Sequence, residues 1–358
     1  MSLEDLRKKI DEADTRIVKL IAERIRVAGE IGKEKRQQGK QIEDLEREMK
    51  VLQRVRTIAT DEKISPEGVE SIYRQIMNVT KSAEGIEGIV AAFQGETGAY
   101  SEEAAFQFFG LSIHPKPCET VDDVFKAVEQ GGAQFGIVAV ENSLEGSINR
   151  TYDLLLESEL RVFGEIDLRV VHCLIASPST RLDLVKRVYS HPQALAQCQA
   201  FLRHMKFELI PTYDTAGSVK MLKEKGITDG AAIASARAAA IYGMQIIARE
   251  IADNPNNFTR FFVLAKEDSP PSGNDKTSIV FALKHQPGAL YEFLKELASR
   301  NINLTKIESR PTRRKPWEYN FYLDFEGHRA DKVAKETLAN LEKMALFVKV
   351  LGSYPKAR

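Results

Sequence analysis

The chain has 358 residues, of which 43% are apolar, and its 51 basic and 51 acidic side chains give a formal net charge of zero. This length allows two or three domains with cores of their own, and the balanced charge argues against a broad nucleic-acid-binding surface. No apolar run approaches the roughly 18 residues of a membrane span. The three cysteines, Cys118, Cys173 and Cys198, show no metal-binding spacing, and the chain enters a charged amphipathic helix at once. We therefore expect free thiols, no signal peptide and a cytoplasmic location.

The first 84 residues carry a helical pattern only. Apolar residues three and four positions apart predict a long first helix, from near Leu3 to near Arg36. Its apolar stripe, expected to be buried, consists of Leu3, Leu6, Ile10, Ala13, Ile17, Leu20, Val27 and Ile31. Breaks at Gly39 and at Ser65-Pro66 separate a second and a third helix. A single helix about 50 Å long cannot bury its apolar face alone, so we expect it to pair with a second subunit.

Arg24 falls on this apolar stripe. A guanidinium that faces a core is unfavourable unless an anion meets it, either a carboxylate of the protein or a bound small acid. Lys35 lies on nearly the same face, about 16 Å along the helix, so the two cations can enclose a small ligand. Arg7 cannot reach that pocket from its own helix, but it can from an antiparallel second copy. Thr80 and Glu84 continue the apolar stripe of the third helix as two polar residues.

Residues 3–84 resemble the all-helical chorismate mutases. The matching segments are LRKKI at 6–10, LIAER at 20–24, GKEK at 32–35 and D-x-x-RE at 44–48, together with Thr80 and Glu84. The resemblance implies a chorismate pocket in which cations bind the two carboxylates and the ether oxygen, Asp44 and Glu48 hold the hydroxyl region, and Thr80 and Glu84 complete the wall. The cations of that pocket are Arg7 from the partner chain, Arg24, Lys35 and Arg47.

The rearrangement of chorismate to prephenate needs no nucleophile. The protein has to hold the compact conformer and stabilise charge on the breaking C–O bond. An ionised carboxylate cannot donate a hydrogen bond to the ether oxygen. We therefore expect Glu84 to work in its protonated form.

A linker at 84–88 is followed by short apolar strands that alternate with helices up to about residue 266. Strands are predicted at 89–93, 136–140, 188–190, 231–234 and 258–265. Polar loops at 94–101, 141–147 and 191–197 follow three of these strands directly, and such loops bind ligands in α/β sheets. No glycine-rich nucleotide motif is present, so we expect no bound nucleotide. We expect no other cofactor and no metal.

Five ordered segments in this region resemble the prephenate dehydratases, from about 89 to 266. They are FQGETGAYSEEAA (93–105), VENSLEGS (140–147), SHPQALAQC (190–198), AAIAS (231–235) and NFTRFF (257–262). The resemblance implies two α/β lobes of the periplasmic-binding-protein kind, with the active site in the cleft between them. It makes Thr259 the best catalytic candidate, with Arg260 binding a carboxylate and Glu141 as the ultimate proton source. The other cleft-lining residues implied are Thr97, Ser101, Asn142 and Ser143.

After a second linker at 266–275, the order becomes strand, helix, strand, strand, helix, strand, which is an α+β, ferredoxin-like arrangement. The strands are expected near 277–283, 303–309, 317–325 and 346–351, and the helices near 287–300 and 330–344. Gly288-Ala289-Leu290 opens the first helix, and Glu308-Ser309-Arg310-Pro311 ends the second strand.

This pair of motifs resembles the ACT domain of dehydratases, over about 276–358. The resemblance implies that phenylalanine binds at a subunit interface, with its carboxylate on helix N-terminal amides and its ammonium on Glu308. The implied site consists of Gly288, Ala289, Leu290, Asn301, Glu308, Ser309 and Arg310.

The sequence thus predicts a multidomain chain with a helical mutase arm at 1–85, a dehydratase domain at 88–267 and a regulatory domain at 276–358. We expect a homodimer or higher homo-oligomer that acts on chorismate and prephenate, responds to phenylalanine, and binds neither nucleic acid nor membrane. Deleting residues 270–358 is expected to leave catalysis and remove inhibition. Three alternatives stay open: a dehydratase whose helical arm only dimerises it, a non-catalytic amino-acid sensor or transport-type binding protein, and arogenate in place of prephenate.

Overall fold

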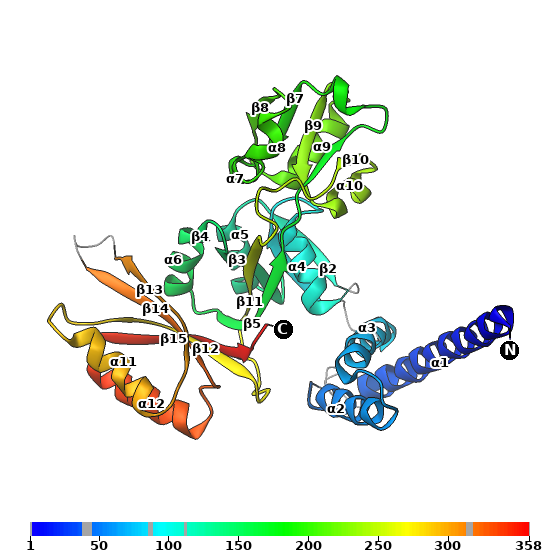
Figure 1. Ribbon diagram of the computed structural model, residues 1–358. Coiled ribbons are helices and arrows are strands. Elements are labelled where there is room, and N and C mark those ends of the chain that lie inside the picture. The colour runs from blue at the N-terminus through cyan, green and yellow to red at the C-terminus, as the bar shows by residue number, and fades with distance from the viewer. Residues whose placement is uncertain (1, 38–44, 85–88, 111–112, 313–317, 358) are drawn as a thin grey trace. The chain divides into compact units, whose positions relative to one another are not determined.

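The computed structural model describes residues 2–37, 45–84, 89–110, 113–312 and 318–357 (Figure 1). The chain forms two compact units. One consists of Met1–Ile89 with Phe108–His114, and the other of Val90–Gln107 with Pro115–Arg358.

The first unit is built on three helices, α1 (Leu3–Gln37), α2 (Leu45–Asp61) and α3 (Pro66–Glu84). Ser65 caps α3, since its Oγ accepts the Gly68 N–H at 3.1 Å, and proline fits the first helical position. Helix α3 packs against both α1 and α2. The small core between them contains Ala28, Leu52, Val55, Ala59 and Met77. The predicted first and third helices are confirmed to within a residue or two.

The apolar stripe of α1 is exposed in the single chain, and its burial against a second subunit stays a prediction. Every side chain from residue 2 to residue 20 is exposed, and Leu3, Ile10 and Leu20 keep 65%, 61% and 63% of their surface. The reason is length: α1 has 35 residues and α3 only 19, so α3 reaches only the C-terminal part of α1.

The second unit begins with a sheet in the strand order β2-β1-β3-β11-β5, with β4 paired to β3. This sheet is the first lobe, and helices α4 (Tyr100–Phe109), α5 (Val121–Glu129) and α6 (Asn149–Glu157) accompany it. Its strands are β1 (Val90–Gln94), β2 (His114–Cys118), β3 (Phe135–Asn142), β4 (Gly146–Ser147), β5 (Arg161–Arg169) and β11 (Phe258–Ala265).

The second lobe is a sheet in the order β10-β6-β9-β7-β8. Its strands are β6 (Cys173–Ala176), β7 (Arg187–Ser190), β8 (Glu208–Pro211), β9 (Gly230–Ala234) and β10 (Gln245–Ala248). Its helices are the 3₁₀ turn Leu182–Leu184, α7 (Pro192–Ala196), α8 (Gln199–Arg203), α9 (Thr215–Glu224) and α10 (Ala236–Tyr242). The chain passes between the lobes twice, after β5 and before β11. The five strands predicted in this region and its two-lobed α/β class are confirmed.

The last part of the chain has the predicted βαββαβ order, with an antiparallel sheet β13-β14-β12-β15. Figure 1 shows both helices on one face of this sheet, where Phe281, Phe293, Leu338 and Leu341 form the core. The elements are β12 (Asp275–Ala282), α11 (Ala289–Ser299), β13 (Leu304–Pro311), β14 (Tyr319–Glu326), α12 (Lys332–Met344) and β15 (Phe347–Pro355). The predicted ferredoxin-like arrangement is confirmed.

The opposite face of this sheet packs on the first lobe. Val280, Tyr322 and Leu351 belong to the same buried cluster as Val162 and Phe262 of the first lobe. A Cβ on Gly352 of β15 would lie 2.2 Å from the Val162 carbonyl oxygen, so only glycine allows β15 to approach β5 this closely. The C-terminal domain and the first lobe therefore share a core.

This shared core changes the expected result of deleting residues 270–358. Removal of the C-terminal domain exposes Val162 and Phe262 and takes Asp324 away from Arg260. We now expect the truncated chain to have a Tm lower by roughly 10 °C or more, and to lose dehydratase activity instead of only its inhibition. Differential scanning calorimetry and an assay with prephenate check this. A truncated chain as stable and active as the full chain would contradict it.

Candidate functional site

The helical unit brings Arg24 and Thr80 together. Arg24 Nη1 on α1 donates a hydrogen bond to Thr80 Oγ1 on α3, and Thr80 is buried. The Thr80 hydroxyl in turn donates to the Ile76 carbonyl of its own helix. The cation on the α1 stripe thus contacts a polar residue on the α3 stripe, and its partner in the chain is a neutral hydroxyl instead of the predicted anion.

For the other predicted mutase residues, the structure gives only the exposure of three side chains. Lys35 is half-buried, while Arg47 and Arg7 are exposed in the single chain. Asp44 lies outside the described residues, and so do the side chains of Glu48 and Glu84.

The glycine loop that follows β1 docks on the second lobe. Gly95 and Gly98 have φ angles of 108° and 94°, which side chains other than glycine rarely adopt. The Ser235 hydroxyl donates to the Gly98 carbonyl at 2.9 Å, and a Cβ on Gly98 would lie 2.9 Å from the Ala238 Cα. Thr97 is held here too, because its carbonyl accepts the Tyr242 hydroxyl at 2.9 Å.

Glu96 of this loop also joins the lobes. Its carboxylate accepts from the Tyr213 hydroxyl and from Lys220 Nζ, each at 3.0 Å. Burial and this hydrogen bond to Glu96 raise the pKa of Tyr213 to about 12. The loop and the second lobe enclose a cleft of about 790 Å³, lined among others by Tyr100, Ser101 and His191. Ser101 lines this cleft, whereas Thr259, Asn142 and Ser143 are not among its lining residues.

Thr259 lies opposite Asn142, where β11 pairs with β3. Asn142 is buried, and its Nδ2 donates to Thr259 Oγ1 at 3.0 Å. Because the amide donates, the Thr259 hydroxyl keeps its own hydrogen for a bound molecule. Ser143 fixes the adjoining turn, since its hydroxyl donates to the Asn256 carbonyl at 3.1 Å and accepts the Phe258 N–H at 3.0 Å.

A buried hydrogen-bond chain continues from Asn142 to the cleft. Asn142 Nδ2 donates to Asn257 Oδ1 at 2.8 Å, Asn257 Nδ2 donates to Gln197 Oε1 at 2.8 Å, and His172 Nε2 lies 3.0 Å from the same oxygen. His172 Nδ1 lies 3.1 Å from the Tyr100 hydroxyl. Burial lowers the pKa of His172, so the ring is neutral at pH 7. In the described part of the chain, Gln197 Nε2 is buried without a hydrogen-bond partner.

Sequence reasoning missed four members of this chain: Tyr100, His172, Gln197 and Asn257. Tyr100, Gln197 and Asn257 lie inside quoted motifs, so a search for polar residues within those motifs would have found them. His172 carries no such signal, because a lone histidine between two strands has no characteristic pattern.

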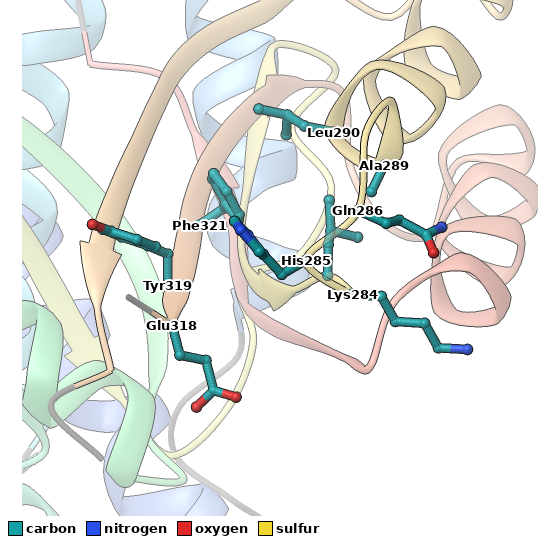
Figure 2. Close-up of a pocket in the computed structure, with 9 residues that line it drawn as sticks. Lys284, His285, Gln286, Ala289, Leu290, Glu318, Tyr319 and Phe321 are labelled. Carbon is teal, nitrogen blue, oxygen red and sulfur yellow. The ribbon is translucent and has the colours of Figure 1, made fainter. Parts of the chain in front are cut away.

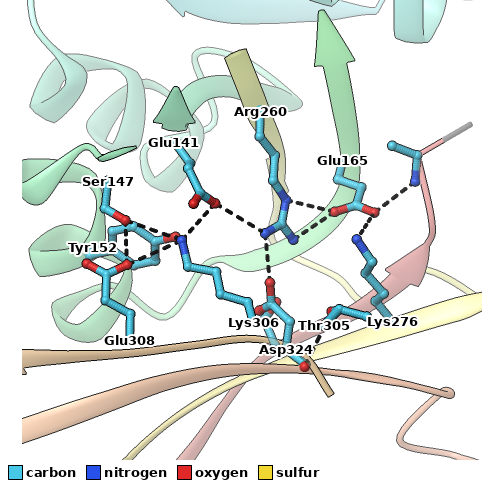
Figure 3. Close-up of polar contacts among 12 residues, drawn as sticks. Glu141, Ser147, Tyr152, Glu165, Arg260, Lys276, Thr305, Lys306, Glu308 and Asp324 are labelled. Atoms are coloured by element: carbon cyan, nitrogen blue, oxygen red, sulfur yellow. Dashed lines mark hydrogen bonds and ion pairs between the residues drawn. The ribbon is translucent and has the colours of Figure 1, made fainter. Parts of the chain in front are cut away.

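Arg260 and Glu141 point toward the C-terminal domain, where Asp324 and Lys306 meet them (Figure 3). The Arg260 side chain is only 13% exposed. Its Nε donates to Glu165 at 2.9 Å and its Nη1 to Asp324 at 2.7 Å. Burial opposes its charge, but Asp324 and Glu165 outweigh it, and the pKa of Arg260 is raised. Adjacent strand residues point to opposite faces, so Arg260 cannot share a pocket with Thr259. These contacts favour a structural role over the predicted role in binding a substrate carboxylate.

The residues predicted to bind phenylalanine also lie in two separate places. Ala289 and Leu290 line a pocket of about 150 Å³ between the loop that precedes α11 and the start of β14 (Figure 2), and Gly288 caps α11 with a φ of 80°. Asn301 has a φ of 56° in the turn after α11, and Ser309 is exposed on β13.

Glu308 and Arg310 point to the first lobe instead. Glu308 accepts from the Ser147 hydroxyl, and Arg310 pairs with Asp153 at 3.1 Å. In this conformation, neither side chain reaches toward the pocket of Ala289 and Leu290.

Within the described ranges, no group of three or more histidine, cysteine, aspartate and glutamate side chains is arranged to hold a metal ion. None of the helices described is long and apolar enough to cross a membrane.

Three family models match successive parts of the chain: Chorismate mutase type II over residues 6–85, Prephenate dehydratase over 91–269 and ACT domain over 277–343. A bifunctional chorismate mutase/prephenate dehydratase from Aquifex aeolicus is 40% identical over 99% of this chain and 98% of its own. Arogenate dehydratase/prephenate dehydratase 2 from Arabidopsis thaliana is 44% identical over 77% of this chain and 75% of its own. The crystal structure of an Arthrobacter aurescens prephenate dehydratase in complex with L-Phe is 33% identical, covers 75% of this chain and 90% of its own, and superposes with a TM-score of 0.69.

These matches confirm the resemblances drawn from the quoted motifs, and they cover all three regions of the chain. The chain belongs to the bifunctional chorismate mutase/prephenate dehydratase family.

Proposed function

We propose that the chain rearranges chorismate to prephenate in its helical unit and converts prephenate to phenylpyruvate in its two-lobed domain, with phenylalanine as inhibitor. The observation that carries this proposal is the likeness to the Aquifex aeolicus bifunctional enzyme over nearly the whole of both chains. We expect no cofactor for either step, because the rearrangement is pericyclic and aromatisation drives the loss of water and carbon dioxide.

In the mutase step, Arg24 and its hydrogen-bond partner Thr80 form the wall of the chorismate pocket. A guanidinium held by a buried hydroxyl is oriented before the ligand arrives, and preorganised donors stabilise developing charge most strongly. Lys35 and Arg47 supply further cations along the same pocket, and Asp44, Glu48 and Glu84 complete it. Arg7 enters from the α1 helix of a second subunit.

In the dehydratase step, prephenate takes up one proton and releases water and carbon dioxide. The C–O bond to the ring hydroxyl breaks as that hydroxyl leaves as water, and the electron pair of the breaking C–C bond to the carboxylate completes the aromatic ring. The Thr259 hydroxyl donates to the leaving oxygen while Asn142 fixes its orientation. Ser101 lines the cleft, while the Thr97 carbonyl and the Ser143 hydroxyl fix their own loops through the hydrogen bonds described above.

Phenylalanine binds at the C-terminal domain. A solved relative of 33% identity is described as a complex with L-Phe, and the Ala289–Leu290 pocket offers an apolar wall next to the first amides of an eleven-residue helix. Amides at a helix N-terminus favour a carboxylate.

A coupled assay tests the whole proposal. Chorismate is supplied to the purified full chain, and phenylpyruvate is followed by its absorbance with and without L-phenylalanine. Production of phenylpyruvate that phenylalanine suppresses supports the proposal. Accumulation of prephenate would leave only the mutase, and no turnover of added prephenate would refute the dehydratase.

Arogenate is a second candidate substrate, favoured by the likeness to the Arabidopsis thaliana arogenate dehydratase/prephenate dehydratase. Comparing kcat/KM for prephenate and arogenate on the same preparation distinguishes the two. We place the enzyme in the cytoplasm, which the three free cysteines favour.

The exposed stripe on α1 supports a dimer whose two long helices cover each other. Leu3, Ile10 and Leu20 are exposed along one face, and apolar helix faces of this length need a partner.

Mixed dimers provide the test of a shared pocket. If Arg7 of one subunit completes the site of Arg24 in the other, Arg7→Ala and Arg24→Ala chains are each inactive as mutases. Unfolded together and refolded at equal amounts, they should recover about a quarter of wild-type activity, because half of the random dimers carry one intact site of two. Recovery of no activity would contradict the shared pocket.

A further inference from the structure

Lys306 is a buried cation of the C-terminal domain to which the two reactions assign no role. It lies on β13, and only 12% of its side chain is exposed. Its Nζ reaches into the first lobe and lies 2.8 Å from Glu141 Oε2, 2.8 Å from the Tyr152 hydroxyl and 3.3 Å from Ser147 Oγ (Figure 3). Burial disfavours its charge, but Tyr152 and Glu141 outweigh it, so the pKa of Lys306 is raised and the side chain stays charged.

These contacts adjoin the candidate dehydratase residues directly. Glu141 precedes Asn142, whose amide holds the Thr259 hydroxyl. Glu141 also pairs with Ser147 across β3 and β4, so Lys306 contacts both sides of the turn that carries Asn142. Asn142 Oδ1 accepts the Leu144 and Glu145 N–H groups of that turn at 3.1 Å each, so the turn is tied to the amide that contacts Thr259.

The same contacts reach the residue implied to bind phenylalanine. Glu308 lies two positions after Lys306 on β13, on the same face of the strand. Its carboxylate is 3.3 Å from Lys306 Nζ and accepts the Ser147 hydroxyl. Glu308, Lys306, Ser147 and Glu141 therefore form one continuous polar cluster, which we call the β13 cluster.

We propose that Lys306 is a positioning residue that holds the Glu141–Ser147 turn, and that the β13 cluster is the route by which a change in the C-terminal domain reaches the dehydratase site. This inference rests on the proposed function. A movement of β13 that takes the Glu308 carboxylate from Ser147 removes one of the turn's two anchors in the C-terminal domain. Lys306 then redistributes between Glu308 and Glu141, and Asn142 no longer orients Thr259.

Lys349 provides a matched control. It too is a lysine of the C-terminal sheet that reaches the first lobe, where its Nζ donates to the Leu156 carbonyl at 2.8 Å and to the Ser158 carbonyl at 2.5 Å. Those carbonyls lie at the end of α6, away from the Glu141–Ser147 turn in sequence. Loss of Lys349 therefore weakens the same domain interface without touching the β13 cluster.

The experiment compares Lys306→Gln, Lys306→Arg and Lys349→Gln in the full chain. Dehydratase kcat and KM, inhibition by L-phenylalanine, mutase activity and Tm are measured for each. For Lys306→Gln we expect kcat with prephenate to fall about tenfold to a hundredfold, and the phenylalanine effect on the remaining activity to shrink to less than about twofold. Mutase activity should not change. Lys306→Arg should restore most of kcat, and Lys349→Gln should lower Tm while keeping wild-type kcat and inhibition.

Two outcomes overturn the inference. In the first, Lys306→Gln has the same kcat and the same inhibition by phenylalanine as Lys349→Gln. In the second, Lys306→Gln lowers kcat by the same factor in a Glu141→Gln background as in the wild-type chain, which shows that the two residues act independently. A wild-type chain that is active but insensitive to phenylalanine overturns the regulatory half. A wild-type chain without dehydratase activity refutes the proposed function itself, which is a distinguishable failure.

Discussion

Thr259→Ala is expected to lower dehydratase kcat about 10²- to 10³-fold, the usual cost of removing one oriented donor from a reacting oxygen. The variant keeps mutase activity, because Thr259 belongs to the two-lobed domain. Asn142 donates to Thr259 Oγ1, so the threonine hydrogen is directed away from the amide and is available for the leaving hydroxyl. Stopped assays with prephenate and with chorismate, run on the same preparation, measure both activities.

Two further variants separate chemistry from stability. Thr259→Ser keeps the hydroxyl and should retain kcat within about tenfold of wild type, since the donor stays in hydrogen-bond reach of Asn142. Thr277→Ala removes another threonine hydroxyl, one that donates to the Gly327 carbonyl at 2.7 Å in the C-terminal domain. That variant should lower Tm and keep dehydratase kcat. Near-normal dehydration by Thr259→Ala would eliminate Thr259 as the donor.

The arrangement of elements followed from the sequence wherever a segment carried a regular apolar period. The three- and four-residue period gave α1, and the runs at 136–140 and 258–265 gave the central strands β3 and β11. The strands β5 and β6 were not predicted although they are largely buried and contain no proline. The strands β2 and β8 were not predicted either, and they contain prolines and no buried residue. Their position at the sheet edges is decided by tertiary pairing instead of a local pattern.

The motifs of the site could be predicted from the sequence, but the fact that their residues point to two different faces of the sheet was not inferred from them. Thr259 and Arg260 are neighbours in one strand, and the two-residue period of a strand already places them on opposite faces. What no pattern indicates is the partner that lies on the far face. Arg260 finds Asp324, more than sixty residues later in the chain, because the C-terminal sheet packs on the first lobe.

The exposed stripe of α1 illustrates the opposite case. Its helical period predicted the correct helix, and the single chain leaves its apolar face uncovered. Sequence periodicity reports that a face is to be buried, but it does not say by which chain. The Arg24–Thr80 contact, by contrast, lies within one chain; the sequence singled out both residues as polar positions on apolar stripes, but the partner it predicted for Arg24 was an anion.

Arg24→Met should reduce mutase kcat/KM by on the order of 10³-fold, since it removes a charged donor preorganised against a dicarboxylic acid. The methionine keeps the apolar stem of the side chain, so the helix packing is retained. Thr80, no longer an acceptor, keeps its bond to the Ile76 carbonyl and is not left unpaired. Dehydratase turnover of added prephenate serves as the internal measure of intact protein.

Arg26→Met is the matched control for this variant. Arg26 lies two residues away on α1 and is exposed, so its replacement removes the same charge from the same helix without touching Thr80. Its mutase kcat/KM should stay within about threefold of wild type, as expected for an exposed charge screened by solvent. Arg24→Lys should behave more like Arg24→Met, because an ammonium cannot reproduce the planar fork of the guanidinium. If Arg24→Met and Arg26→Met lost activity equally, the effect would come from net charge, and Arg24 would have no place in a mutase pocket.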